Sequence, residues 1–271
     1  MNYRAAHGIK TGAKLFEGEK WLVLTSLLGF LLAGICGAWV MVYGASVAPE
    51  GNIAKAFSFN TALGLFLLST AAILPLSATG RRSKSFLSWA FITIALYFYF
   101  AENVQNFRGV NPRFVNDNGT TFDVTVSTVF AVVVLLLVLF YLFLAIQYFR
   151  LRAYVLRPEL VLSIRYAMLA VMLSFAAGIL ISLIQSRFTG MHGNIIWLHG
   201  LGFHALQAVP VVAWLSERKP IIPTSRHSLI HITGIAYLLG LAAIGWQTLL
   251  GYSIFTWSVL PFFAFCFFLI A

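Results

Sequence analysis

Charged side chains are scarce in this sequence. Only 10% of the 271 residues are Asp, Glu, Lys or Arg, whereas 60% are hydrophobic and the mean hydropathy is +0.88. So few polar side chains cannot coat the surface of a water-soluble globule of this size. The sequence therefore predicts a chain that is solvated by lipid.

Cysteine and the common catalytic motifs are also scarce. The two cysteines, Cys36 and Cys266, both fall in apolar segments, which gives no basis for a disulfide framework or a cysteine metal site. There is no Gly-rich phosphate loop, nucleophile elbow or Asp-rich prenyl-diphosphate motif, and no lysine in the middle of an apolar segment. ATP-driven transport, serine hydrolysis, prenyl transfer and a retinal Schiff base therefore have no support. No internal repeat is convincing.

Apolar segments of about 20 residues recur along the whole chain, and this is the length that an α-helix needs to cross roughly 30 Å of hydrocarbon. They predict an all-α integral membrane bundle of about eight transmembrane helices, formed by one domain over 21–271 after a basic segment over 1–20. The predicted spans are 21–44, 60–79, 86–105, 127–149, 163–185, 195–215, 229–249 and 252–270. Only Gly251 and Tyr252 separate the last two, so seven spans are the alternative.

Lys and Arg are divided unequally between the two sides of such a bundle. With the N-terminus inside, 14 lie on the cytoplasmic side and four lie outside. The fourteen are Arg4, Lys10, Lys14, Lys20, Arg81, Arg82, Lys84, Arg150, Arg152, Arg157, Arg165, Arg218, Lys219 and Arg226, and the four are Lys55, Arg108, Arg113 and Arg187. Because cytoplasmic loops retain positive charge, eight spans predict cytoplasmic N- and C-termini, and seven would leave the C-terminus outside.

The formal charge of +10 is accordingly a topology signal. The basic residues stand in short segments between apolar spans, without the interleaved exposed aromatic residues of a nucleic-acid surface, so no nucleic-acid partner is predicted. The lipid bilayer is the predicted partner, and the segment 1–20 is expected to lie on the anionic cytoplasmic leaflet.

Ionisable groups are costly inside a bilayer, so their positions indicate where a site lies. They gather in the predicted outer half, around the long outer loop 106–126 and the sixth span. The candidates for acid–base catalysis are Glu102, Asp123, His199 and His204, and those for substrate binding are Gln105, Arg108, Arg113 and Gln207. Asp117 in the loop and His192 before the sixth span belong to the same group.

The three polar residues of the sixth span share one sector of a helical wheel. With His199 at zero, Gln207 falls near 80° and His204 near 140°, at about 100° per residue. Both histidines are therefore expected to point into the bundle from adjacent edges, as proton carriers or as ligands of a metal or haem. The alternative is structural: Glu102 pairs with an arginine, and the histidines form hydrogen bonds between helices.

A second histidine pair, His227 and His231, stands at the start of the seventh span with i, i+4 spacing. Such spacing can place two imidazoles on one metal ion, as in helical zinc sites. No third ligand is near in the sequence, and interfacial histidines at a helix start are the alternative interpretation.

Two motifs resemble a family of bacterial multi-pass membrane proteins that has no known activity. They are Glu-x-x-Gln-x-x-Arg-Gly over 102–109, followed by Phe122 and Asp123, and His-x4-His-Ala-Leu-Gln over 199–207. The resemblance implies that the two polar segments belong together. The chain is also similar to haem A synthase in its eight spans and intramembrane histidines, but the Glu-x-x-His-Arg signature of that family is absent.

We expect the protein to lie in the bacterial cytoplasmic (inner) membrane, and three functions follow as hypotheses. The first is a membrane-embedded enzyme or cofactor protein, with haem or a metal ion as the cofactor, that acts on a lipid-soluble substrate in an outward-facing pocket. The second is a small-solute or proton-coupled transporter, which needs polar groups on the cytoplasmic side; Gln147, Gln247 and the pair His227 and His231 are the candidates. The third is a non-catalytic subunit that docks other membrane proteins or a second copy of itself.

Overall fold

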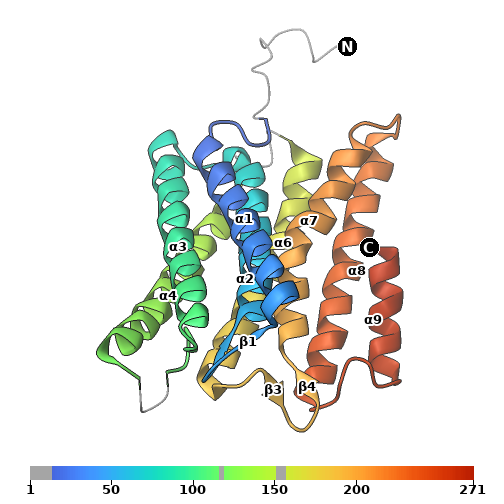
Figure 1. Cartoon of the computed structure of the whole chain (residues 1–271). Coiled ribbons are helices and arrows are strands. Elements are labelled where there is room, and N and C mark those ends of the chain that lie inside the picture. The colour runs from blue at the N-terminus through green and yellow to red at the C-terminus, as the bar shows by residue number, and fades with distance from the viewer. Residues whose placement is uncertain (1–13, 116–118, 151–156) are drawn as a thin grey trace.

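The computed structural model describes residues 14–115, 119–150 and 157–271. These residues form an all-α bundle in which eight α-helices are described, and seven of those are long and apolar enough to cross a membrane (Figure 1). The seven are α1 (Lys20–Tyr43), α2 (Ile53–Ile73), α3 (Arg81–Phe107), α4 (Thr121–Phe149), α6 (Pro158–Ile184), α7 (Ile196–Ser216) and α8 (Pro223–Leu249). The predicted fold class is confirmed. Asp117 and the segment 1–13 lie outside the described residues.

Short elements complete the chain. The 3-10 helix η1 (Leu74–Leu76) extends α2, and α9 (Val259–Ile270) follows α8. Two antiparallel hairpins of two-residue strands join α1 to α2 and α6 to α7. Their strands are β1 (Ser46–Val47) with β2 (Gly51–Asn52), and β3 (Phe188–Thr189) with β4 (Gly193–Asn194).

The last helix is shorter than the predicted span over 252–270. Residues 250–258 form turns, and α9 over Val259–Ile270 has 12 residues, which extend about 18 Å at 1.5 Å per residue, less than the roughly 30 Å of hydrocarbon. Phe268 packs on Tyr237 in the middle of α8, with ring centroids 5.2 Å apart. The C-terminal residues therefore lie beside the middle of the bundle (Figure 1), and α9 does not carry the chain to the face at which α8 begins.

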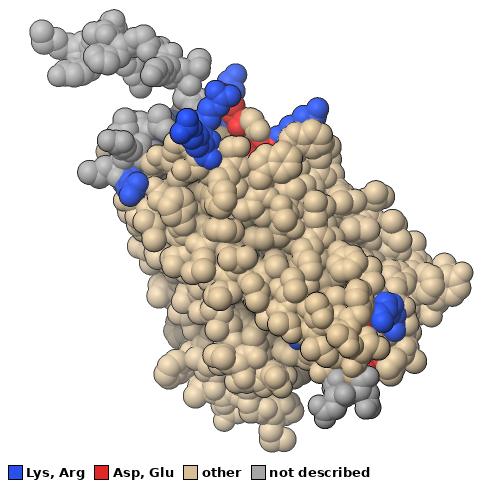
Figure 2. All heavy atoms as spheres, turned by 90° about the vertical axis from the view of Figure 1, so that its left-hand side faces the viewer, with Lys and Arg blue, Asp and Glu red and all other residues tan. Residues whose placement is uncertain are grey.

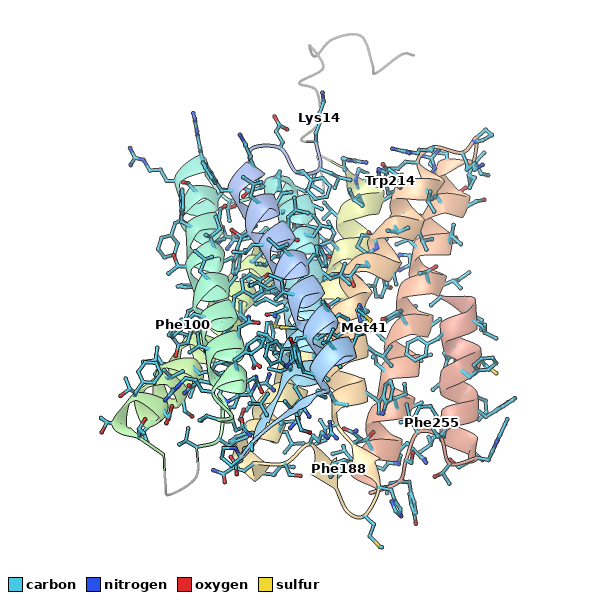
Figure 3. All side chains as sticks on the ribbon, in the orientation of Figure 1. Lys14, Met41, Phe100, Phe188, Trp214 and Phe255 are labelled. Atoms are coloured by element: carbon cyan, nitrogen blue, oxygen red, sulfur yellow. The ribbon has the colours of Figure 1, made fainter. Side chains whose placement is uncertain are left out.

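Charge is confined to the two ends of the bundle. The end at which α1, α3, α6 and α8 begin carries most of the described Lys and Arg, and we call it the basic face; the other end is the outer face. Figure 2 shows these side chains above and below a broad band without charge, and Figure 3 places Lys14 and Trp214 toward the basic face and Phe188 and Phe255 toward the outer face. The helices alternate in direction as the Lys and Arg distribution predicts.

The fold contains a repeat that the sequence did not reveal. The hairpin formed by β1 and β2 recurs as β3 and β4, 142 residues later, with Ser46 opposite Asn52 in the first and Phe188 opposite Asn194 in the second. In each half a third helix follows the two helices that the hairpin joins. The third helices, α3 and α8, begin at Arg81 and Pro223, again 142 residues apart. The first half is thus α1 to α4, and the second half is α6 to α9.

Matching hydrogen bonds hold each hairpin to the end of the third helix of its own half. The Glu50 amide donates to the Gly109 carbonyl at 2.8 Å, and the His192 amide donates to the Gly251 carbonyl at 3.1 Å. A Cβ added at Gly51 would lie 2.2 Å from the Asn106 carbonyl oxygen, and one at Gly193 would lie 2.3 Å from that of Thr248. Glycine is needed in both hairpins because the backbone of the third helix lies directly against it.

Aromatic side chains fill the middle of the bundle, where the halves meet. Phe66 of α2 packs on Tyr141 of α4 at 4.8 Å between ring centroids, and on Phe203 of α7 at 5.1 Å. Phe175 of α6 completes the cluster at 5.1 Å from Phe203 and 5.8 Å from Tyr141. These edge-to-face and tilted contacts form a dense aromatic core between the basic and outer faces.

Candidate functional site

Two ion pairs hold the outer end of α3 to the loop and helix that follow it. The Arg108 guanidinium lies 2.6 Å from the Asp123 carboxylate, and the Arg113 guanidinium contacts the Glu102 carboxylate. The side chains of the two acids are 4% and 1% exposed, whereas both arginine side chains are 41% exposed. Each carboxylate is therefore buried while its partner remains open to the outer face. The predicted pairing of Glu102 with an arginine is present.

Asp123 is held by four donors from three residues. Its Oδ1 accepts from Gln105 Nε2 at 3.0 Å and from Arg108, and its Oδ2 accepts from the Thr120 amide at 3.1 Å and the Thr120 hydroxyl at 2.6 Å. The Thr120 hydroxyl also accepts from the Asp123 amide, which completes a capping box at the start of α4. This carboxylate is thus fully hydrogen-bonded as part of the helix start.

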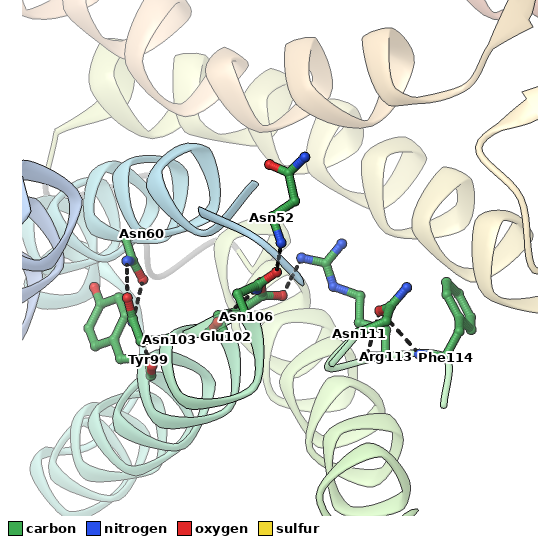
Figure 4. Close-up of polar contacts among 9 residues, drawn as sticks. All are labelled: Asn52, Asn60, Tyr99, Glu102, Asn103, Asn106, Asn111, Arg113 and Phe114. Carbon is green, nitrogen blue, oxygen red and sulfur yellow. Dashed lines mark hydrogen bonds and ion pairs between the residues drawn. The ribbon is translucent and has the colours of Figure 1, made fainter. Parts of the chain in front are cut away.

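Glu102 has fewer partners. Besides Arg113, the described residues give its carboxylate one hydrogen bond, from Asn106 Nδ2 at 3.3 Å. Asn106 in turn accepts from the Asn52 amide at 3.0 Å, which ties the first hairpin to α3 (Figure 4). The Glu102 charge therefore depends chiefly on Arg113.

Arg113 of the outer loop also packs on aromatic rings of two helices. Its guanidinium lies over the rings of Phe59 and Phe130, 5.0 and 5.7 Å from their centroids. These contacts place Arg113 against α2, α3 and α4.

His199 is packed between α7 and α6. Its Nδ1 lies 2.8 Å from the Ser174 carbonyl oxygen, which can only accept, so Nδ1 carries the proton and Nε2 carries the lone pair. The ring lies against Gly178, where an added Cβ would come within 2.7 Å of Cε1. The Ser174 hydroxyl donates back to the His199 carbonyl. The predicted interhelical hydrogen bond of this histidine is present.

His204 is the last member of a series of hydrogen bonds in which a backbone carbonyl determines which groups donate and which accept. The Ser69 hydroxyl donates to the Leu65 carbonyl at 2.8 Å, so its oxygen must accept from Gln207 Nε2 at 2.5 Å. The Gln207 carbonyl oxygen then accepts from His204 Nδ1 at 3.0 Å. His204 therefore carries its proton on Nδ1, and its Nε2 keeps a free lone pair.

The His204 side chain is exposed, although it stands eight residues into α7, about 12 Å along the helix axis from its outer end. One turn toward that end is Gly200, where an added Cβ would have no atom within 4 Å. Among the residues that the structure describes, Nε2 of neither His199 nor His204 makes a hydrogen bond. The open space beside Gly200 leads along the helix to the exposed imidazole.

The two histidines do not converge on one ligand. His199 Nδ1 is hydrogen-bonded to α6, and His204 Nδ1 is linked through Gln207 to Ser69 of α2, so the two rings are anchored to different helices. Within the described ranges no three His, Cys, Asp or Glu side chains group as metal ligands. His227 and His231 pack edge to face at 5.0 Å, and Nδ1 of His231 is hydrogen-bonded to the Tyr166 hydroxyl at 2.7 Å. The donor set therefore does not fit a metal site with three or more protein ligands.

No family model, curated protein or solved structure matches this chain. The site must be interpreted from its own geometry.

Several polar partners were not predicted from the sequence. Ser69 and Ser174 fix the tautomers of the histidines, yet single serines in apolar helices give no sequence signal of such a role. A further buried network joins α1, α2 and α3: Asn60 Nδ2 donates to Asn103 Oδ1 at 2.9 Å, and the Cys36 thiol lies 3.2 Å from the same oxygen (Figure 4 shows the two asparagines). Two asparagines within apolar spans could have indicated this network.

Proposed function

We propose that this protein is a membrane-embedded enzyme of the bacterial inner membrane that acts on a lipid-soluble substrate at the outer half of the bundle. His204 is the acid–base group of this site, and Gln207 and Ser69 orient it. Arg113, paired with Glu102, and Arg108, paired with Asp123, are each 41% exposed at the outer end of α3 and are the candidate groups for binding a polar part of the substrate. The distribution of Lys and Arg supports the inner membrane and this orientation.

The free Nε2 lone pair of His204 carries the proposal. An imidazole that is exposed at membrane depth is costly unless it has a polar partner. Its Nδ1 already donates to Gln207 in the series of hydrogen bonds that ends at the Leu65 carbonyl, so Nε2 is the nitrogen that lacks a polar partner among the described residues. A substrate hydroxyl or carbonyl that enters from the lipid beside Gly200 would supply that partner.

The chemistry that this arrangement supports is proton transfer. The neutral imidazole takes a proton from a substrate hydroxyl on Nε2, and the resulting positive charge is stabilised through Nδ1 by the Gln207 carbonyl oxygen. A haem or metal ion bound by His204 alone is the cofactor alternative, because a histidine ligand commonly donates its other N–H to an oxygen in this way.

The transporter hypothesis is less well supported. Gln147 and His231 lie in the basic half, but Gln247 lies at the outer end of α8 and donates to the Ser253 carbonyl at 3.1 Å, contrary to its assignment to the cytoplasmic side. The aromatic core around Phe66 and Tyr141 lies between the polar groups near the outer face and those near the basic face, and it would interrupt a polar path between them.

The test is to purify the full chain in detergent and measure its absorption spectrum, its metal content and the lipophilic compounds extracted by organic solvent. We expect one class of compound to co-purify and to be depleted at least tenfold in His204→Ala, as loss of one hydrogen-bonding partner of a bound group implies. A Soret band or stoichiometric metal that disappears in His204→Ala would identify the cofactor alternative.

His192→Ala is the matched control. This histidine is exposed on the outer face, and its amide donates to Gly251 through the backbone. Equal retention of the compound in wild type, His204→Ala and His192→Ala would refute a site at His204. His199→Ala separates the two histidines, since its ring faces α6.

A further inference from the structure

A pocket of about 650 Å³ opens at the basic face, between the start of α1 and the start of α3. It lies at the opposite end of the bundle from His204. Its lining residues come from the turn before α1, from α1, from the end of η1 and from α3, and those that carry charge or an exposed aromatic ring are Glu17, Glu19, Trp21, Arg81, Lys84 and Trp89. No part of the proposed outer site contributes to it.

The acidic side chains of the pocket are already engaged. Glu19 is 7% exposed and its carboxylate accepts from the Ser88 hydroxyl at 2.6 Å. Burial raises the pKa of Glu19, an effect that the Ser88 hydrogen bond and the Lys84 charge oppose. Glu17 accepts from the Lys14 amide at 2.9 Å. Both carboxylates therefore have protein donors, and both place negative charge near Lys84, whereas Arg81 forms no ion pair with a described residue.

The donors of the pocket are only partly used. Lys84 Nζ gives one of its three protons to the Pro75 carbonyl at 2.5 Å. The side chains of Arg81 and Ser85, and the indole N–H groups of Trp21 and Trp89, make no hydrogen bond to any described residue. All of these groups can donate a hydrogen bond, although the Ser85 hydroxyl can also accept one and the exposed Glu17 carboxylate adds an acceptor to the lining. Such a set recognises an oxyanion, and a phosphate accepts from several donors at once.

The position of the pocket indicates where that phosphate comes from. Trp21, the second residue of α1, is 59% exposed where aromatic rings mark the boundary between headgroups and acyl chains, and Trp89, eight residues into α3, is 55% exposed about 12 Å deeper along its helix. Lys20 and Arg82 stand beside the lining residues on the same two helices. The N-terminal ends of α1 and α3 add the positive ends of their dipoles.

We propose that this pocket binds the headgroup phosphate of one anionic phospholipid from the leaflet at the basic face, with Arg81 and Lys84 as its charged donors and the two tryptophans beside the glycerol and the upper acyl chains. The site holds a lipid in a fixed place between α1 and α3.

The experiment titrates dioctanoyl phosphatidylglycerol into the detergent-purified full chain and counts bound lipid by native mass spectrometry. We expect one lipid to bind ahead of all others, and Arg81→Gln to weaken it about tenfold, the effect of one charge-assisted hydrogen bond. Arg82→Gln is the matched control: it is the next residue, exposed on the same helix, and does not line the pocket. It should change the affinity less than twofold, a change within the scatter expected for surface pairs.

Equal weakening by Arg81→Gln and Arg82→Gln would overturn the proposal, because it would show diffuse attraction to the basic face. A competition with inorganic phosphate tests the source of the ligand. Failure of millimolar phosphate to displace the lipid is expected, since phosphate lacks the acyl chains; displacement at equal concentration would assign the pocket to a soluble phosphate compound and refute the lipid. An unchanged unfolding temperature of both variants excludes misfolding as the cause.

Discussion

The two ion pairs at the outer end of α3 form a natural comparison, because both arginine side chains are 41% exposed and both carboxylates are buried. They differ in what remains when the arginine is removed. Asp123 would keep three hydrogen bonds, two from Thr120 and one from Gln105, whereas Glu102 would keep one, at 3.3 Å. We therefore predict that Arg113→Ala destabilises the protein more than Arg108→Ala.

The magnitude follows from the carboxylate that is left behind. Removing one partner of a fully buried pair costs about 3–5 kcal/mol, and the partial exposure of the arginine reduces this to about 2–3 kcal/mol for Arg113→Ala. The satisfied Asp123 carboxylate limits the cost of Arg108→Ala to about 1 kcal/mol. The difference corresponds to roughly 5 °C in unfolding temperature for a chain of this size.

Thermal unfolding in detergent, followed by far-UV circular dichroism, measures the order of the two variants. The double variant Arg113→Ala with Glu102→Gln should recover most of the loss, because the neutral amide carries no charge that needs compensation. Equal destabilisation by the two alanine variants, or no recovery in the double variant, would refute the reasoning that the residual partners of the carboxylate decide the cost.

Two further predictions concern the repeat and the topology. Gly109→Ala should lower the unfolding temperature well below that of Gly251→Ala. Both glycines have a positive φ, but a Cβ at residue 109 would lie 1.9 Å from the Ala48 carbonyl oxygen, whereas one at residue 251 would lie 3.2 Å from its nearest atom. Similar unfolding temperatures of the two variants would contradict the packing described for the first hairpin. In whole cells, a membrane-impermeant thiol reagent should label Lys55→Cys and spare Lys219→Cys, and the reverse pattern would invert the assigned orientation.

Hydropathy was sufficient to find the spans, but it placed several of their ends wrongly. The second span was predicted to start at residue 60, yet α2 begins at Ile53, because the Asn52 side chain accepts from the Lys55 amide and caps the helix. The third was predicted to start at residue 86, yet α3 begins at Arg81. Long basic side chains extend toward water from helical positions, so charge does not mark where such a helix starts.

The sequence singled out polar residues that stay predictions as site residues, and their partners could be found only from the fold. The sequence indicated that Glu102 meets an arginine but gave no means of choosing between Arg108 and Arg113. The choice is made by the capping box of α4, which places Asp123 beside Arg108. The repeat was missed because few identities mark it, such as Gly-Asn-Ile at 51–53 and 193–195, and Gln105 with Gln247.

The repeat also determines how the two halves of the chain are oriented relative to each other in the membrane. A unit with an even number of membrane passages enters and leaves on the same side, so two copies in one chain stand the same way up, related by an axis along the membrane normal. The inverted arrangement that lets many carriers exchange inward and outward states needs units with opposite orientation. In this chain both hairpins face the same compartment, and after duplication one copy could acquire charge at its third helix while the other, with Ile244 at the position matching Glu102, stayed apolar.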